Sequence, residues 1–194
     1  MNTQEFEKNY WRYYLMLETK FAQTLQYVTL SSDNFDTYSN EYAHLIQTVG
    51  AELDAFFKVY CGFAPLEYKN ISDYAAVILQ DWSDIKKQIV KADDISLQPF
   101  ENWDERCAKQ SLFWWEVFDT IKHSRVVNEK VASLKNTIYI LAALYMLEMK
   151  FFKKLADMNG DVDILQDGSN VFLLDNWTTR YLSSKGAVLQ IRNN

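Results

Sequence analysis

The stretch Ile138–Leu147, which reads IYILAALYML, is the strongest indication of the architecture because it is apolar on nearly every side. A helix that is hydrophobic all round is either buried among other elements or spans a membrane. This run is about half the ~20 residues that a membrane-spanning helix needs. It therefore predicts a central helix surrounded by other helices, and the apolar periodicity around it extends that helix from about Asn128 to Met158.

Four further helices are expected on the N-terminal side of that stretch. Apolar residues recur there at spacings of three and four, which is the pattern of one buried helical face. The helices that this pattern predicts cover residues 4–28, 40–61, 72–91 and 105–123. Tyr10 and Tyr13 belong to the expected buried stripe of the first helix, and Gly62 should end the second. Ser72 is the expected N-cap of the third helix.

An ordered loop is expected between the third and fourth of these helices, over residues 93–104, where Phe100 and Trp103 would pack on the bundle. The pattern changes again after Gly160. There VDILQ and NVFLL flank Asp167-Gly168, an arrangement typical of a β hairpin, and AVLQI near the end should add a short strand. A two-stranded hairpin is marginal alone, so it should lie on the bundle.

The predicted fold class is therefore all-α. It consists of an up-and-down bundle of about five helices over residues 1–158, and residues 159–194 form a small C-terminal β hairpin and tail packed on that bundle. The chain has 194 residues, and no Gly-, Pro- or Ser-rich linker divides it, so one domain is expected.

Composition favours a large core and argues against a protein that coats nucleic acid. The chain is 48% hydrophobic, and its net charge of -6 comes from 26 acidic and 20 basic residues. Coating a duplex needs a concentrated basic face, whereas the basic residues here are scattered. The six tryptophans are expected in the core and not on a base-stacking platform.

The N-terminus lacks the basic start and apolar core of a secretory signal, so a cytoplasmic location away from membranes is expected. Cys61 and Cys107 do not lie at the short spacings that bind zinc or do redox chemistry. Both are therefore expected to be reduced thiols in the core.

The most distinctive text is SLFWWEVFDTIKHSRVVNEKVASLKN, residues 111–136, which joins the fourth helix to the fifth. On a helix, Glu116, Asp119 and His123 share one face at spacings of three and four, which places two carboxylates beside an imidazole. Glu116, Asp119 and Lys122 are the candidate binding residues of this face. Two carboxylates and a histidine on adjacent turns can also bind a metal ion in a helical bundle. Bundles that bind two irons usually take a Glu-x-x-His motif from each of two helices, and this chain has no such repeat. No metal and no cofactor are therefore expected.

This stretch resembles a family of uncharacterised bacterial helical proteins whose pattern is similar to Trp-Trp-x-x-Tyr-Asn-x-x-Lys-His-x-Arg. The residues that carry the resemblance are Trp114, Trp115, Lys122, His123 and Arg125. Phe118 and Asp119 stand where that pattern has Tyr and Asn. The resemblance covers most of the helical part of the chain but not the β tail. More distantly, the arrangement is similar to HEPN domains, which are helical bundles of RNA-cleaving toxins and phage-defence proteins.

HEPN nucleases resemble one another in an Arg that is followed, four to six positions later, by a His. Such a pair suits RNA cleavage because His exchanges a proton near neutral pH and Arg stabilises charge on the phosphate. When His123 is aligned with that His, Phe118 stands where the Arg should be. The resemblance therefore implies a non-enzymatic or degenerate HEPN-like binding module, dimeric and linked to bacterial defence or stress. The alternative is a metal-independent ribonuclease that uses His123 and Arg125 on RNA.

The residues themselves also support a purely structural role. A histidine near the end of a helix interacts favourably with the negative end of the helix dipole, and Lys122 and Arg125 would do the same. If the helix continues to Arg125, that guanidinium faces inward and needs a carboxylate. Glu52, Asp54 and Glu148 lie near the buried stripes of their own helices and are the candidate partners.

Overall fold

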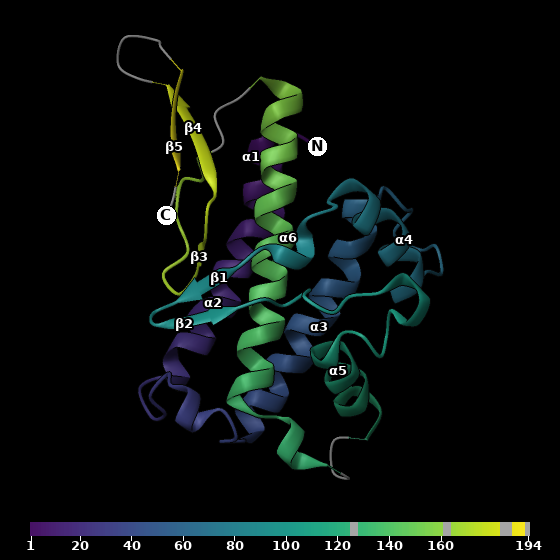
Figure 1. The fold of residues 1–194 in the computed structure, drawn as a ribbon, viewed down its shortest axis with the longest axis vertical. Helices are drawn as coiled ribbons and strands as arrows, with labels where there is room; N and C mark the ends of the chain where they lie inside the picture. Colours follow the sequence, from purple (N-terminus) through teal and green to yellow (C-terminus); the bar gives the residue numbers. More distant parts are fainter. Residues whose placement is uncertain (125–127, 161–163, 183–187, 193–194) are drawn as a thin grey trace.

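The computed structural model describes residues 1–124, 128–160, 164–182 and 188–192, with side chains up to residue 179. Within these ranges the protein is mainly α-helical, and a small antiparallel sheet and a separate hairpin complete it (Figure 1). The predicted fold class is confirmed. No helix in the described part of the chain is both long enough and apolar enough to cross a membrane.

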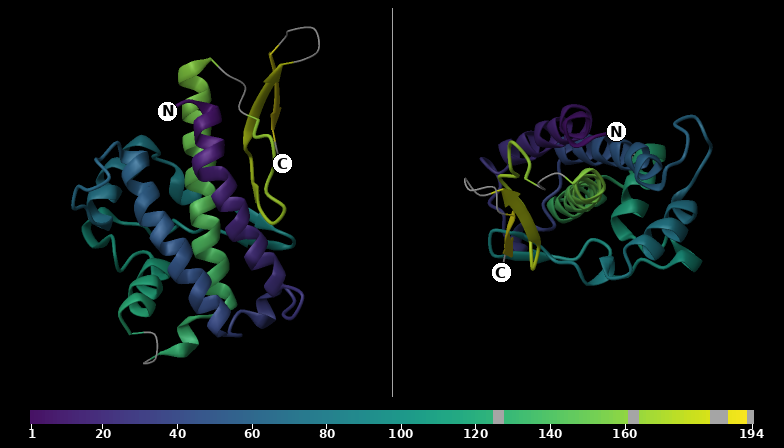
Figure 2. Two further views of the ribbon diagram at one scale, coloured as in Figure 1. Left: turned by 180° about the vertical axis from the view of Figure 1, so that it is seen from behind. Right: turned by 90° about the horizontal axis from the view of Figure 1, so that it is seen from above.

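The central helix is α6 (Leu134–Asn159), which carries the stretch Ile138–Leu147. Every residue from Ile140 to Glu148 is buried. Seen from above, the helix lies between the other elements (Figure 2, right). The prediction of a central helix is confirmed, although α6 begins later than Asn128 because residues 129–131 form a 3-10 turn.

The second predicted helix is confirmed as α3 (Asn40–Cys61). Its start is fixed by Ser39, whose hydroxyl accepts a hydrogen bond from the Tyr42 amide at 3.1 Å. Its end is fixed by Gly62, which has a φ of 72° that side-chain-bearing residues rarely adopt.

The first predicted helix is one helical run of three parts: α1 (Thr3–Phe6), the π-helical segment η1 (Glu7–Trp11) and α2 (Arg12–Thr24). The expected buried stripe is wrong at two positions, because Trp11 and Tyr14 are buried whereas Tyr13 is exposed and Tyr10 only half-buried. A π turn takes about one residue more than an α turn, so it shifts the inward face from Tyr10 and Tyr13 to Trp11 and Tyr14.

The third predicted helix is shorter than expected. It is α4 (Ile71–Asp81), and Asn70 caps it in place of Ser72 by accepting a hydrogen bond from the Ser72 amide at 2.8 Å. The chain then leaves the helical path at Trp82, passes through a 3-10 turn at residues 85–87 and becomes strand β1 (Val90–Ala92).

Strand β1 is the centre of a three-stranded antiparallel sheet. It pairs with β2 (Ile95–Leu97), which lies within the predicted loop, and with β3 (Leu173–Leu174). The loop prediction is therefore wrong for β2. The prediction that Phe100 and Trp103 pack on the bundle is confirmed, because both side chains are fully buried.

The hairpin predicted around Asp167-Gly168 is wrong. Strand β3, which lies in NVFLL, pairs with β1 and not with VDILQ, whose first two residues, 162–163, lie outside the described ranges. The C-terminal hairpin is instead β4 (Thr178–Leu182) with β5 (Val188–Arg192), and β5 confirms the strand expected in AVLQI. Figure 1 shows the sheet and the hairpin on one side of α6, and α4 on the other side.

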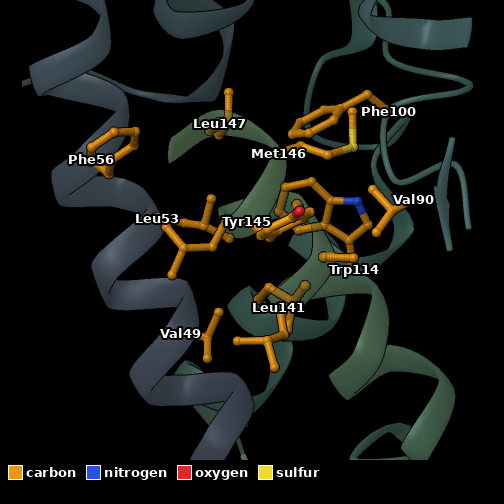
Figure 3. Packing of buried hydrophobic residues seen from close by; sticks show 14 of the residues in the cluster. Val49, Leu53, Phe56, Val90, Phe100, Trp114, Leu141, Tyr145, Met146 and Leu147 are labelled. Atoms are coloured by element: carbon orange, nitrogen blue, oxygen red, sulfur yellow. The ribbon is translucent and has the colours of Figure 1, made fainter. Parts of the chain in front are cut away.

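All six tryptophans are buried, as expected for core residues. They are Trp11, Trp82, Trp103, Trp114, Trp115 and Trp177. Figure 3 shows one part of this core, with Val49, Leu53 and Phe56 on α3 and Leu141 and Tyr145 on α6.

Candidate functional site

The candidate site lies on helix α5 (Phe113–Ser124), which is shorter than the helix expected over 105–123. Residues 105–107 form a separate 3-10 turn, and four turn residues follow before α5 begins. The Asp104 carboxylate accepts a hydrogen bond from the Arg106 amide, and the Asp104 amide donates to the Ser111 hydroxyl, each at 2.9 Å. Such side-chain to backbone bonds compete with helical ones, which explains the late start of α5.

The inner face of α5 is aromatic and belongs to the core. The indole Nε1 of Trp114 donates a hydrogen bond to the Pro99 carbonyl oxygen at 2.7 Å. Trp115 and Phe118 are buried and meet edge to face, with ring centroids 5.3 Å apart. Phe118 also packs on Gly50 of α3. These contacts fix the rotation of α5 and therefore decide which residues its outer face presents.

The outer face carries the predicted set of charged residues. The Asp119 carboxylate lies between a lysine and a histidine side chain, with Oδ2 at 2.6 Å from Lys109 Nζ and Oδ1 at 3.4 Å from His123 Nε2. The His123 side chain is 69% exposed. Glu116 is exposed one turn earlier, and the Lys122 ammonium lies 5.6 Å from the centroid of the Phe118 ring.

The structure brings Asp119 and His123 together as their spacing predicts, and it adds Lys109, which sequence reasoning missed. Lys109 lies in the turn before α5, ten residues from Asp119, so no helical spacing indicates the contact. Chemically, the three side chains form a solvated chain of ammonium, carboxylate and imidazole. An imidazole in water can exchange protons. The Asp119 carboxylate beside it, however, already forms an ion pair with Lys109.

Arg125, the second candidate catalytic residue, lies outside the described residues. Its three proposed carboxylate partners are in different environments. Asp54 accepts a hydrogen bond from the Tyr74 hydroxyl at 3.1 Å. Glu52 is half-buried, and Glu148 is fully buried without a hydrogen-bond partner. Burial, reinforced by the charge of Glu52, raises the pKa of Glu148 well above its usual range.

Within the described ranges, no group of three or more His, Cys, Asp or Glu side chains is arranged to hold a metal ion. Two hollows lie near the end of the bundle where α3 begins, and no motif indicated either of them. One, of about 360 Å³, includes Ile121 of α5 and Ser39 in its lining. The other, of about 660 Å³, is lined by residues from the end of α2 and the start of α3.

Comparison of the chain with protein-family models, with curated proteins and with solved structures finds no match.

Proposed function

We propose that the protein is a non-enzymatic, HEPN-like helical binding module that acts through the outer face of α5. The observation that carries the proposal is the place of Phe118. This residue stands where an HEPN nuclease has its catalytic Arg, and it is 6% exposed, between Trp115 and Gly50. A buried aromatic ring at that position supplies no cation to a phosphate, so the residues that remain on this face suit binding better than cleavage.

The partner that we propose is a second copy of the chain. The outer face of α5 carries acidic residues, Glu116 and Asp119, and basic residues, Lys122 and His123, within about two helical turns. In a two-fold interface the same patch meets itself, so Glu116 of one copy can lie opposite Lys122 of the other. A face with both signs of charge is complementary to itself in this arrangement.

Charge reversal tests this proposal through the oligomeric state in solution. Sedimentation equilibrium should show a dimer for the wild type and weaker association for Glu116→Lys and for Lys122→Glu. The double variant, which restores opposite charges, should recover the dimer. Lys86→Glu, an exposed lysine of the turn after α4, is the matched control and should leave association unchanged. A monomeric wild type, or equal association in all five proteins, would overturn the proposal.

A metal-independent ribonuclease is the second candidate, and the exposure of His123 is the observation that favours it. A nuclease needs an accessible imidazole, and this one is 69% exposed. Incubation of purified wild type, His123→Ala and Arg125→Ala with mixed RNA separates the candidates. The binding module predicts intact RNA in all three samples. Cleavage by the wild type that both variants lose would replace the lead proposal with the nuclease.

A cytoplasmic location and a role in bacterial defence or stress belong to the same proposal. Their support is the HEPN resemblance carried by the residues from Trp114 to Arg125. Among the described residues, the finding that no helix can cross a membrane is compatible with that location.

A further inference from the structure

Three polar side chains from three helices meet in one layer of the bundle, next to a layer of phenylalanine rings. The Phe6 ring lies 6.2 Å from that of Phe56 of α3 and 5.6 Å from that of Phe152 of α6, measured between centroids. The N-terminal helical run is antiparallel to α3 and α6 (Figure 2, left). One turn after Phe6, and one turn before the other two rings, stand Tyr10, Glu52 and Glu148. Tyr10 also packs on Phe56, at 5.4 Å, so these three polar residues share the next layer.

Glu148 lies at the inner end of this polar layer. Its side chain is fully buried, and neither carboxyl oxygen has a hydrogen-bond partner. The titratable groups that face it are Glu52 of α3 and Tyr10 of η1, and the charges of both carboxylates act on Tyr10 as well. Among the residues that the structure describes, no cationic side chain forms an ion pair with either carboxylate. A buried carboxyl in such surroundings is far more stable with its proton than without it.

The polar layer is covered by residues 3–10, the part of the N-terminal run that precedes Trp11. These residues contact the layer and the neighbouring rings through Phe6 and Tyr10. Tyr10 and Glu52 are both half-buried, so water reaches the outer edge of the layer but not Glu148. If residues 3–10 moved away, Glu148 would become hydrated and could carry a charge.

The π-helical segment η1 is a suitable hinge for this movement. Helices kink at π-helical turns, where the regular ladder of hydrogen bonds is interrupted. At the end of η1 the chain is fixed, because Trp11 is 1% exposed and its indole Nε1 donates to the Asp167 carbonyl oxygen at 2.6 Å. Residues 3–10 can therefore swing about η1 while Trp11 and α2 stay in the bundle.

We propose that residues 3–10 form a pH-sensitive latch, which is closed over Glu52 and Glu148 while Glu148 carries its proton and swings open at η1 when that proton is released. Burial and the charge of Glu52 raise the pKa of Glu148 in the closed state. The closed latch therefore binds one proton more than the open latch at any pH between the ordinary pKa and the raised one, and opening becomes easier as the pH rises. The latch does not depend on the outer face of α5 or on the proposed dimer.

Hydrogen–deuterium exchange of the full chain between pH 6 and pH 9 tests the latch. Protection factors, which compare each amide with its rate in an unfolded chain, are followed for residues 7–10 and for Ile140–Leu147 of α6. One proton released on opening raises the opening equilibrium by up to roughly tenfold per pH unit. Protection of residues 7–10 should fall accordingly and should be lower at every pH than that of the central helix, because the latch opens without global unfolding.

Two variants and a control connect the pH dependence to the two carboxyls. Glu148→Met removes the proton that is released, so protection of residues 7–10 should lose most of its pH dependence. Glu52→Gln removes one of the two causes that hold this proton, so the fall should end at a lower pH. Glu41→Gln, at an exposed glutamate in the first turn of α3, should behave like the wild type.

Three results would overturn the latch. The first is protection of residues 7–10 that does not change with pH in the wild type, even if overall stability does change. The second is protection of residues 7–10 equal to that of Ile140–Leu147 at every pH, because these residues would then open only when the whole bundle unfolds. The third is the same pH dependence in Glu148→Met as in the wild type.

Discussion

The Phe118 ring of α5 fills the space beside Gly50 of α3: a Cβ atom placed on Gly50 would stand 2.2 Å from Phe118 Cδ2. Glycine within a helix costs about 0.5–1 kcal/mol relative to alanine. Gly50 lies in the middle of the 22-residue helix α3, where its backbone needs no special conformation. The close approach of Phe118 is therefore the physical reason for a glycine at this position, and it ties the site-bearing helix to the bundle.

Gly50→Ala should lower the free energy of unfolding by about 1–3 kcal/mol, because overpacking exceeds the gain in helix propensity. Urea denaturation followed by tryptophan fluorescence measures the change. The double variant Gly50→Ala/Phe118→Leu should recover part of the loss, since it removes the ring that the methyl group meets. Stabilisation by Gly50→Ala, which propensity alone predicts, would mean that the two helices do not approach this closely.

Glu148 should make the protein less stable as the pH rises. Its carboxyl is fully buried without a partner, and burial and the charge of Glu52 raise its pKa. The unfolded chain releases this proton near the ordinary pKa of about 4.3, whereas the folded chain retains it to a higher pH. Above that ordinary pKa the folded state binds more protons than the unfolded state, so stability falls with increasing pH.

Glu148→Met should therefore stabilise the protein by about 1–4 kcal/mol at pH 8, and by less at pH 5. Methionine has a similar volume and leaves no polar atom unpaired in the core. Chemical denaturation at both pH values provides the comparison, and Glu105→Gln, at an exposed glutamate of the 3-10 turn before α5, is the control that should change neither. A variant with the same pH dependence as the wild type would show that Glu148 titrates normally.

Glu18 of α2 anchors the segment around Ser169 and Asn170, which follows α6 in the chain. This buried carboxylate accepts hydrogen bonds from the Tyr14 hydroxyl at 2.5 Å, from the Ser169 hydroxyl and from the Asn170 amide at 2.8 Å. Glu18→Ala should cost about 3–5 kcal/mol, since it leaves several buried donors unpaired. Ser169→Ala removes one of these three bonds and also the bonds that the Ser169 hydroxyl accepts from the Val171 and Phe172 amides, so it should cost about 1–3 kcal/mol.

Limited proteolysis measures the local consequence of losing Glu18. The segment from Ile164 to Phe172 should become cleavable in Glu18→Ala before the bundle unfolds, because Glu18 and the bond from Trp11 Nε1 to the Asp167 carbonyl hold it in place. Thr19→Val, an exposed neighbour on the same helix, should be cleaved like the wild type. Cleavage of the bundle helices before this segment would contradict the anchoring role.

The parts of the fold that sequence predicted well are those that local signals decide. The bounds of α3 follow from a serine cap and a terminal glycine, and the burial of α6 follows from its uniform apolarity. The buried stripe of the first helix was wrong at Tyr10 and Tyr13 because a π-helical segment leaves no clear periodicity signal. Side-chain packing, which places Trp11 inside, decides that segment.

Long-range contacts explain the other errors. Strand β3 pairs with β1, more than 80 residues away, and the Glu18 bonds hold the Asp167-Gly168 region beside α2, where a local hairpin had been expected. At the candidate site, helical spacing predicted the pair of Asp119 and His123, but Lys109 reaches Asp119 only because α5 starts late. The hollow of about 660 Å³ joins the end of α2 to the start of α3, and no motif links these two segments.

The two cysteines should differ strongly in reactivity, although both were expected to be core thiols. Cys107 is exposed in the 3-10 turn before α5, so that expectation is wrong for it, because the chain turns outward there. Cys61 is half-buried, and burial together with the charge of Asp81 raises its pKa to about 12.

Only the thiolate reacts with alkylating agents. Iodoacetamide at pH 8 should therefore modify Cys107 within minutes and Cys61 much more slowly, and peptide mass spectrometry assigns the sites. Cys107→Ser should abolish the fast phase, and unfolding in urea should make both thiols of the wild type reactive. Equal rates in the folded wild type would mean that the end of α3 is open to solvent.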